Sequence, residues 1–234
     1  MCGRYRLSRR KEILAEHFET DFDDLEWEPR YNIAPTQPVA VIRRAGESPA
    51  RKASVMRWGL VPSWASDPTG GASLINARAE TAGGKPSFRE PLRQQRCLIP
   101  ADAFYEWRRR AREKQPFCFE VGMGEIFAFA GLWDRWRGQG GQTIATCTIL
   151  TTTANALLDD VHDRMPAILA AQDYDRWLDP AMQDVQRAVS LLKPYDAVLM
   201  RCYPVSTRVN LVTNDGPECS ARVELPATTG LLFG

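Results

Sequence analysis

Histidine and lysine are both scarce in this sequence of 234 residues, and its net charge is close to zero. The chain has 2 histidines, His17 and His162, and 5 lysines beside 25 arginines, for a formal net charge of +1. A histone-type basic arm is therefore excluded, and histidine-dependent chemistry must use one of two side chains. No metal site is expected, because two histidines without clustered cysteines give poor ligand spacing.

The sequence also lacks paired cysteines and long apolar runs. Its 6 cysteines form no C-x-x-C pair, and the first residues, MCGRYRLSRRKE, contain no hydrophobic stretch of a signal peptide. We therefore expect free thiols in a reducing cytoplasm, no membrane span and no cofactor. No period repeats along the chain, and the 44% hydrophobic content is typical of a globular protein.

The hydrophobic pattern predicts an α+β fold in one domain over residues 1–234, with a mainly antiparallel, barrel-like sheet and flanking short helices. Strands are expected in the middle of the chain: PVAVIRR and KASVMRW as a hairpin, then RCLIP, AFYEWRR, PFCFEV, EIFAFAGLWD and TIATCTILTT, with GQGGQ as a turn. Helices are expected over 8–18 with Ser8 as N-cap, and in NALLDDV, QDYDRWL and PAMQDVQRAVSLL, the last starting at Pro180. The segment 58–80 has too many prolines and glycines for a continuous element and is expected to be a functional loop.

Charge is distributed unevenly along the near-neutral chain. Residues 88–115 have eight basic and four acidic side chains, whereas 154–187 have three basic and seven acidic ones. In the basic segment the charges alternate with Phe88, Phe104, Tyr105 and Trp107, which is typical of a groove for single-stranded nucleic acid. The alternative is that RRRAREK is simply the solvated end of a hairpin.

Cys2 follows the initiator methionine directly, and removal of Met1 would give it a free α-amine. An amine with a pKa of about 7.7–8.0 and a thiol with a pKa of about 8.5 then share one residue. Such an aminothiol can attack an aldehyde to form an imine, which the thiol closes to a thiazolidine. It can equally act as an N-terminal nucleophile on an amide carbonyl, with the amine as base.

Three further segments carry candidate chemistry. In NARAE, Asn76 and Arg78 would share one face of an extended segment and could grip a phosphate. Glu106 lies among aromatic residues, where desolvation would raise its carboxyl pKa, although a salt-bridged carboxylate is the simpler alternative. His162 in VHDRMP is expected in a loop that enters a strand, oriented by Asp163 or Arg164. His17, by contrast, is interpreted as a structural helix residue.

Together these segments resemble the SRAP family, the SOS response-associated peptidase-like proteins that act on abasic sites in DNA. The resemblance rests on MCGRY, RYNIAPTQ, MRWGLVPSW, LINARAET, CLIPADAFYEW, TTTAN, VHDRMP and PVSTRVN, so that it covers a core of about residues 2–212. Residues 19–28 and the tail after Asn210 show little that matches.

The resemblance implies that mature Cys2 captures the ring-opened aldehyde of an abasic deoxyribose as a thiazolidine DNA–protein crosslink. It assigns catalytic roles to Asn76, which positions the sugar, Glu106, the acid–base carboxylate, and His162, which assists ring opening and crosslink reversal. It assigns DNA contacts to Arg78, Arg4, Arg30, Asn32, Ala34, Pro35, Trp58, Gly59, Leu60, Pro62, Trp64 and Arg164. The expected partner is single-stranded DNA with an abasic site, bound by a monomer that is cytoplasmic and nucleoid-associated in a bacterium, or nuclear in a eukaryote.

Two rival functions remain open at this stage. The first is an N-terminal-nucleophile cysteine peptidase or amidohydrolase, because MCG also opens glutamine amidotransferases. The second is a non-covalent module for single-stranded DNA in which Cys2 is inert. Lyase activity and peptidase-like autoprocessing are further hypotheses.

Overall fold

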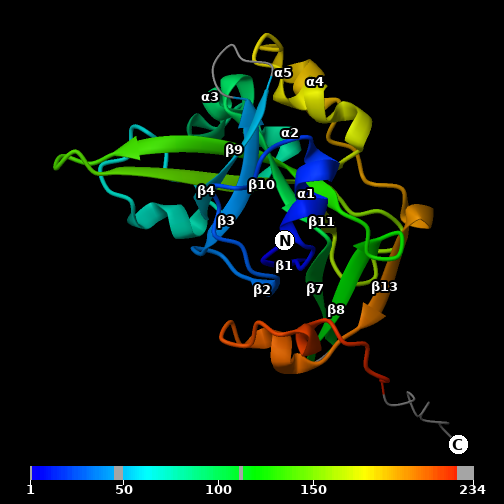
Figure 1. Ribbon diagram of the computed structural model, residues 1–234. Helices are drawn as coiled ribbons and strands as arrows, with labels where there is room; N and C mark the ends of the chain where they lie inside the picture. The colour runs from blue at the N-terminus through cyan, green and yellow to red at the C-terminus, as the bar shows by residue number, and fades with distance from the viewer. Residues whose placement is uncertain (1, 45–49, 111–112, 226–234) are drawn as a thin grey trace, which may run out of the picture.

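A closed ring of five strands forms the centre of the computed structural model, which describes residues 2–44, 50–110 and 113–225 (Figure 1). The ring follows the order β10-β4-β3-β6-β9 and closes because β9 pairs again with β10. Its strands are β3 (Pro38–Arg44), β4 (Arg51–Trp58), β6 (Arg96–Ala101), β9 (Phe127–Arg137) and β10 (Thr143–Thr153). The β4–β10 contact is parallel and the other four are antiparallel. The expected barrel-like sheet is therefore confirmed.

Short strands extend the barrel, and a second sheet lies beside it. β5 (Asn76–Arg78) and β11 (Arg164–Pro166) both pair with β10, and β12 (Ile168–Leu169) pairs with β9. The second sheet has the order β13-β8-β7-β1-β2, formed by β1 (Arg4–Leu7), β2 (Arg30–Ile33), β7 (Ala103–Arg110), β8 (Glu113–Val121) and β13 (Met200–Pro204). The chain thus brings its N-terminal strand between β2 and β7.

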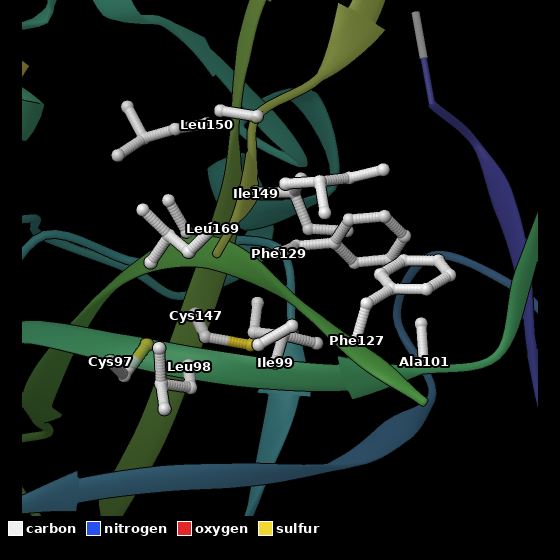
Figure 2. Packing of buried hydrophobic residues seen from close by; sticks show 14 of the residues in the cluster. Cys97, Leu98, Ile99, Ala101, Phe127, Phe129, Cys147, Ile149, Leu150 and Leu169 are labelled. Carbon is white, nitrogen blue, oxygen red and sulfur yellow. The ribbon is translucent and has the colours of Figure 1, made fainter. Parts of the chain in front are cut away.

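The barrel interior explains why these segments form strands. Branched and aromatic side chains of the barrel strands alternate inward, and Figure 2 shows Phe127, Phe129 and Ile149 packed together over Ile99. Tyr5 from β1 joins this core, since its ring meets those of Phe129 and Trp58 at centroid distances of 5.6 and 5.4 Å. The N-terminal strand is therefore anchored to the barrel core.

Short helices surround the sheets. They are α1 (Lys11–Phe18), α2 (Ala79–Ala82), α3 (Pro86–Gln94), α4 (Tyr174–Leu178) and α5 (Val185–Val189), with 3-10 turns over Thr69–Ser73, Ala171–Asp173, Ala197–Leu199, Thr207–Asn210 and Pro217–Cys219. In Figure 1, α3, α4 and α5 gather at the top, and the chain after β13 runs along the bottom below β2 and β8. The hairpin of β3 and β4, the turn between β9 and β10 and the helix in QDYDRWL are confirmed.

Three helix predictions are wrong in detail. Ser8 caps no helix, because its N–H and O–H both donate to Asp102 Oδ2, at 2.6 and 3.0 Å. NALLDDV forms turns and no helix, although Asn155 Oδ1 accepts from the backbone of Leu157 and Leu158, at 3.1 Å each, as an N-cap would. The last helix begins at Val185, where the Asp184 side chain accepts from the next turn, and not at Pro180.

Candidate functional site

Cys2 lies just before β1 and is fully buried. The Asn76 amide Nδ2 donates to the carbonyl oxygen of Cys2 at 2.8 Å, so that β5 holds the start of the chain in place. Burial raises the pKa of the Cys2 thiol well above its usual range, and the nearby Glu106 carboxylate raises it further. The sulfur therefore stays protonated at neutral pH, and it can act as a nucleophile only when a neighbouring group accepts its proton.

Asn76 and Arg78 share β5, as the extended spacing predicted. β5 runs parallel to β10, with Asn76 beside Ile149 and Arg78 beside Thr151. The Arg78 side chain is exposed and takes part in none of the hydrogen bonds or ion pairs found in the described part of the chain. One strand thus directs an amide to the N-terminal residue and leaves a free guanidinium at the surface.

Glu106 occupies β7 and is 3% exposed. Burial raises the pKa of its carboxyl group above the ordinary value. The neighbouring aromatic residues are fixed by hydrogen bonds, from Tyr105 Oη to the Tyr31 carbonyl oxygen and from Trp107 Nε1 to Asn210 Oδ1, both at 2.7 Å. A carboxyl group with a raised pKa can donate a proton closer to neutral pH.

His162 lies in the turn that enters β11, as predicted, and both proposed neighbours contact it. The Arg164 backbone N–H donates to His162 Nδ1 at 3.0 Å, and Asp163 Oδ1 lies 2.9 Å from the same nitrogen. The two contacts suit different forms of the ring, since the backbone N–H needs a lone pair on Nδ1 and the carboxylate needs a proton there. Partial burial lowers the pKa of His162, which favours the neutral ring.

Arg164 is held in a fork that sequence reasoning missed. Its Nη1 and Nη2 atoms bind the two carboxylate oxygens of Glu80 at 2.8 and 2.9 Å, and Nη2 also donates to the Thr151 carbonyl oxygen at 2.6 Å. Glu80 is the second residue of α2, two residues after Arg78. Nothing in the sequence pairs residues 80 and 164, because they meet only through the pairing of β5 and β11 with β10.

Electrostatic coupling shows that these segments converge. The Glu106 carboxylate raises the pKa of the Cys2 thiol, and Asp163 contributes to the raised pKa of Glu106. The positive charge of Arg109 on β7 contributes to the lowered pKa of His162. β1, β5, β7 and the turn before β11 therefore bring a thiol, an amide, a carboxyl group and an imidazole to one place.

The end of β4 and the first residues of the loop that follows it are interior. The residues Trp58, Gly59, Leu60 and Pro62 are buried, whereas Trp64 is 66% exposed. Trp58 Nε1 donates to the Ile75 carbonyl oxygen at 2.8 Å. Gly59 has φ +126, and a Cβ there would lie 2.6 Å from the Gly71 carbonyl oxygen. The buried residues thus fix the loop that presents Trp64.

Several residues to which the resemblance assigns DNA contacts have structural partners here. Asn32 is fully buried, and its Nδ2 faces the carbonyl oxygens of Val209, Leu211 and Asn214 at 2.7–3.1 Å. Arg4 Nη1 donates to the Val209 carbonyl oxygen at 2.7 Å. Arg30 pairs with Asp215, while Ala34 is buried and Pro35 half-buried. Asn32 and Arg4 hold the segment after Thr207 against β1 and β2.

The aromatic residues of the basic segment 88–115 do not form an open stacking surface. Phe88, Phe104 and Tyr105 are 3%, 0% and 0% exposed and belong to the interior. Their side chains serve the core, so the expectation that these three rings receive bases is wrong, whereas Trp107 is half-buried and its contact with a base stays a prediction. Arg109 and Lys114 remain exposed on the β7–β8 hairpin.

The chain belongs to the SRAP family: the model of that family, described as SOS response associated peptidase (SRAP), matches residues 1–212. The "Abasic site processing protein YoqW" of Bacillus subtilis is 44% identical over 221 residues, covering 93% of this chain and 98% of the relative. The "Abasic site processing protein HMCES" of Gallus gallus is 34% identical over 229 residues, covering 85% and 68%. A crystal structure of a Bacteroides thetaiotaomicron protein superposes with a TM-score of 0.86 at 28% identity, covering 95% and 100%.

No helix of the described residues is long and apolar enough to cross a membrane. The same residues contain no group of three or more His, Cys, Asp or Glu side chains that could hold a metal ion.

Proposed function

We propose that this protein captures abasic sites in single-stranded DNA covalently, through Cys2 after removal of Met1. The observation that carries the proposal is the convergence on Cys2 of Asn76, Glu106 and the His162 turn. The names of its relatives, abasic site processing proteins, support the choice of lesion. The protein acts as a monomer, and it needs neither metal nor cofactor.

The proposed reaction joins the deoxyribose aldehyde to the aminothiol with loss of one water. The α-amine of mature Cys2 adds to the aldehyde carbon, and the carbinolamine expels water to give an imine. The thiol sulfur then bonds to the same carbon while its proton moves to nitrogen, which completes the five-membered thiazolidine. Because burial keeps the thiol protonated, the amine attacks first and the sulfur second.

Glu106 and His162 divide the proton transfers in this scheme. A buried carboxyl with a raised pKa supplies the proton that carries the hydroxyl group away as water. A neutral His162, favoured by its lowered pKa, assists opening of the sugar ring. Asn76 holds the Cys2 carbonyl oxygen, so that the amine points at one position.

DNA contacts in this proposal come from exposed groups around Cys2. Arg78 and the basic hairpin with Arg109 attract the phosphate backbone, and Trp64 stacks beside the lesion. Arg164 contributes once a phosphate competes with Glu80. Binding is therefore sensitive to salt and insensitive to base sequence.

The test mixes Met1-free protein with a fluorescent single-stranded oligonucleotide that holds one abasic site. We expect a species that survives SDS, with the mass of protein plus DNA minus water in intact mass spectrometry. Cys2→Ala should abolish the adduct and keep salt-sensitive binding, whereas Cys202→Ser, a half-buried thiol on β13, should leave the adduct unchanged.

Retained Met1 gives an independent check, because its peptide bond turns the Cys2 amine into an amide. A non-removable N-terminal extension should abolish the adduct. Full crosslinking by the extended protein, or peptide or glutamine turnover without any adduct, would contradict the aminothiol mechanism and favour an N-terminal-nucleophile hydrolase.

A further inference from the structure

A groove lies under the acidic segment 21–28, and Arg30 is its one lining residue to which the resemblance assigns a DNA contact. Its volume is about 810 Å³, and its floor consists of apolar side chains from β1, β2, β3 and β4. None of Cys2, Asn76, Glu106 and His162 lines it. The groove reaches β1 at Leu7, beyond the Arg4 end of the strand that leads to Cys2.

The floor presents exposed apolar surface where a soluble domain would normally be polar. Val55 on β4 is 50% exposed, although its strand neighbours Ala53 and Met56 are buried. Leu25 and Trp27 form the opposite wall and are half-buried. Apolar residues that line a concavity in this way are typical of a site that another molecule covers.

The rim carries negative charge that nothing in the described chain neutralises. Asp24, Glu26 and Glu28 are exposed lining residues, and none of them belongs to an ion pair among residues 2–44, 50–110 and 113–225. The basic lining residue Arg30 is already paired with Asp215. The free charge of the groove is therefore negative, which repels DNA phosphates and attracts cationic groups.

The wall is also rigid before any partner arrives. Lys11 Nζ donates to the carbonyl oxygens of Asp23 and Leu25 at 2.9 and 3.2 Å, and Trp27 Nε1 donates to the Arg9 carbonyl oxygen at 3.1 Å. Phe22 is 1% exposed and anchors the start of the segment in the core. A preformed wall lowers the ordering cost of binding.

We propose that this groove binds a cationic amphipathic segment of a partner protein, with arginine or lysine side chains at the acidic rim and leucine- or phenylalanine-sized side chains on the floor. Charge complementarity selects this occupant over nucleic acid. The groove would let the protein hold a partner and DNA at the same time, because the two surfaces share none of the four residues around Cys2. The proposal does not depend on the chemistry of Cys2.

The test uses a fluorescein-labelled, capped octapeptide of alternating arginine and leucine, followed by fluorescence anisotropy at low and high salt. Matched probes alternate arginine with serine, or glutamate with leucine. We expect the arginine–leucine probe to bind best and to weaken with salt. Abasic single-stranded DNA should not displace it.

Two triple variants that remove the same number of negative charges distinguish binding of the probe in the groove from general electrostatic attraction to the protein. Asp24→Asn/Glu26→Gln/Glu28→Gln should weaken the probe by roughly fivefold or more, on the scale of a few partly exposed ion pairs. Asp159→Asn/Asp160→Asn/Glu224→Gln, on exposed residues away from the groove, should change affinity by less than about twofold. Val55→Ser should weaken the arginine–leucine probe and leave the arginine–serine probe unchanged.

Four results would overturn the proposal. Equal losses in the two triple variants would mean nonspecific attraction, and equal binding of the serine probe would mean that the floor contributes nothing. Displacement by DNA would place the peptide at the DNA surface. A groove-dependent dimer in analytical ultracentrifugation would identify a second copy of this chain as the occupant.

Discussion

Asp102→Asn should destabilise the protein strongly, because Asp102 is the centre of a buried charge network at the start of β7. Asp102 is 0% exposed, and its Oδ1 accepts from Arg6 Nε at 2.5 Å while Oδ2 accepts from Ser8 N–H and Oγ–H. Arg6 is itself 9% exposed and also pairs with Glu120 at 2.7 Å. An asparagine at this position has one acceptor oxygen, and its NH₂ group would face either the Arg6 donor or the two Ser8 donors, where the carboxylate has an oxygen that accepts.

The expected cost follows from that geometry. Breaking a buried ion pair by removing one partner costs about 3–5 kcal/mol, since it leaves an uncompensated charge. Glu120 still neutralises part of the Arg6 charge, so we expect the lower end of that range, about 3 kcal/mol. The exposed pair of Arg187 with Asp184, at 3.6 Å and 76% and 54% exposed, provides the comparison: Arg187→Gln should cost less than about 0.5 kcal/mol.

Urea unfolding at pH 7, followed by far-UV circular dichroism, measures both variants. A double-mutant cycle with Arg6→Met should show that Asp102→Asn costs much less once the arginine is gone. A loss below about 1 kcal/mol for Asp102→Asn would refute the argument. Equal costs at Asp102 and Arg187, or strict additivity in the cycle, would refute it as well.

Three further predictions concern the site. Glu106→Gln should raise the free energy of unfolding at pH 7, and this gain should disappear below pH 4.5, the ordinary pKa of the carboxyl group. A carboxyl whose pKa is raised in the folded state lowers stability only at pH values where the unfolded chain ionises it. Thermal melts at several pH values measure the gain, and a gain that is constant with pH contradicts the prediction. Glu80→Gln should shift the acid limb of the pH profile of the crosslinking rate to lower pH, because the Arg164 charge that lowers the pKa of His162 is then no longer neutralised. Glu80→Asp, which keeps the negative charge, should return the acid limb to its original pH. Single-turnover rates measure the profile, and an unshifted acid limb in Glu80→Gln argues against the coupling. Gly59→Ala should lower the free energy of unfolding by more than about 2 kcal/mol, because the residue has a positive φ and the new Cβ would lie against the Gly71 carbonyl oxygen. A Cβ at Gly140 has nothing within 4 Å, so Gly140→Ala should leave stability nearly unchanged; denaturant melts measure both variants.

The strands were predictable because their hydrophobic alternation is strong. β6 to β10 follow the expected runs closely, since each places apolar side chains in the interior of the protein. The helix α3 was not predicted: it starts at Pro86 and contains Pro91, which reads as a breaker. The opposite error concerns 155–161, where the Asn155 side chain binds backbone donors as at a helix start, yet the chain continues in turns.

The chemistry of the site was predictable to a different degree from its geometry. Residue type and neighbours singled out Cys2, Glu106 and His162 as candidates and predicted the direction in which burial moves the pKa of Glu106. They did not identify the Glu80–Arg164 fork, whose partners are 84 residues apart. Nor did they show that Trp58 is a core residue, because an aromatic in a loop looks the same in sequence whether it faces inward or outward.

Because β10 pairs with several strands, the residues around Cys2 come together only late in folding. β5, which carries Asn76, and β11, which follows His162, are both ordered by pairing with β10, and β9 closes the barrel on the same strand. During synthesis the cysteine leaves the ribosome first and β10 much later, and such long-range pairing is the slow part of folding. In the proposed mechanism, the young chain therefore has Cys2 without Asn76 and the His162 turn around it, and these groups reach it only when the barrel closes.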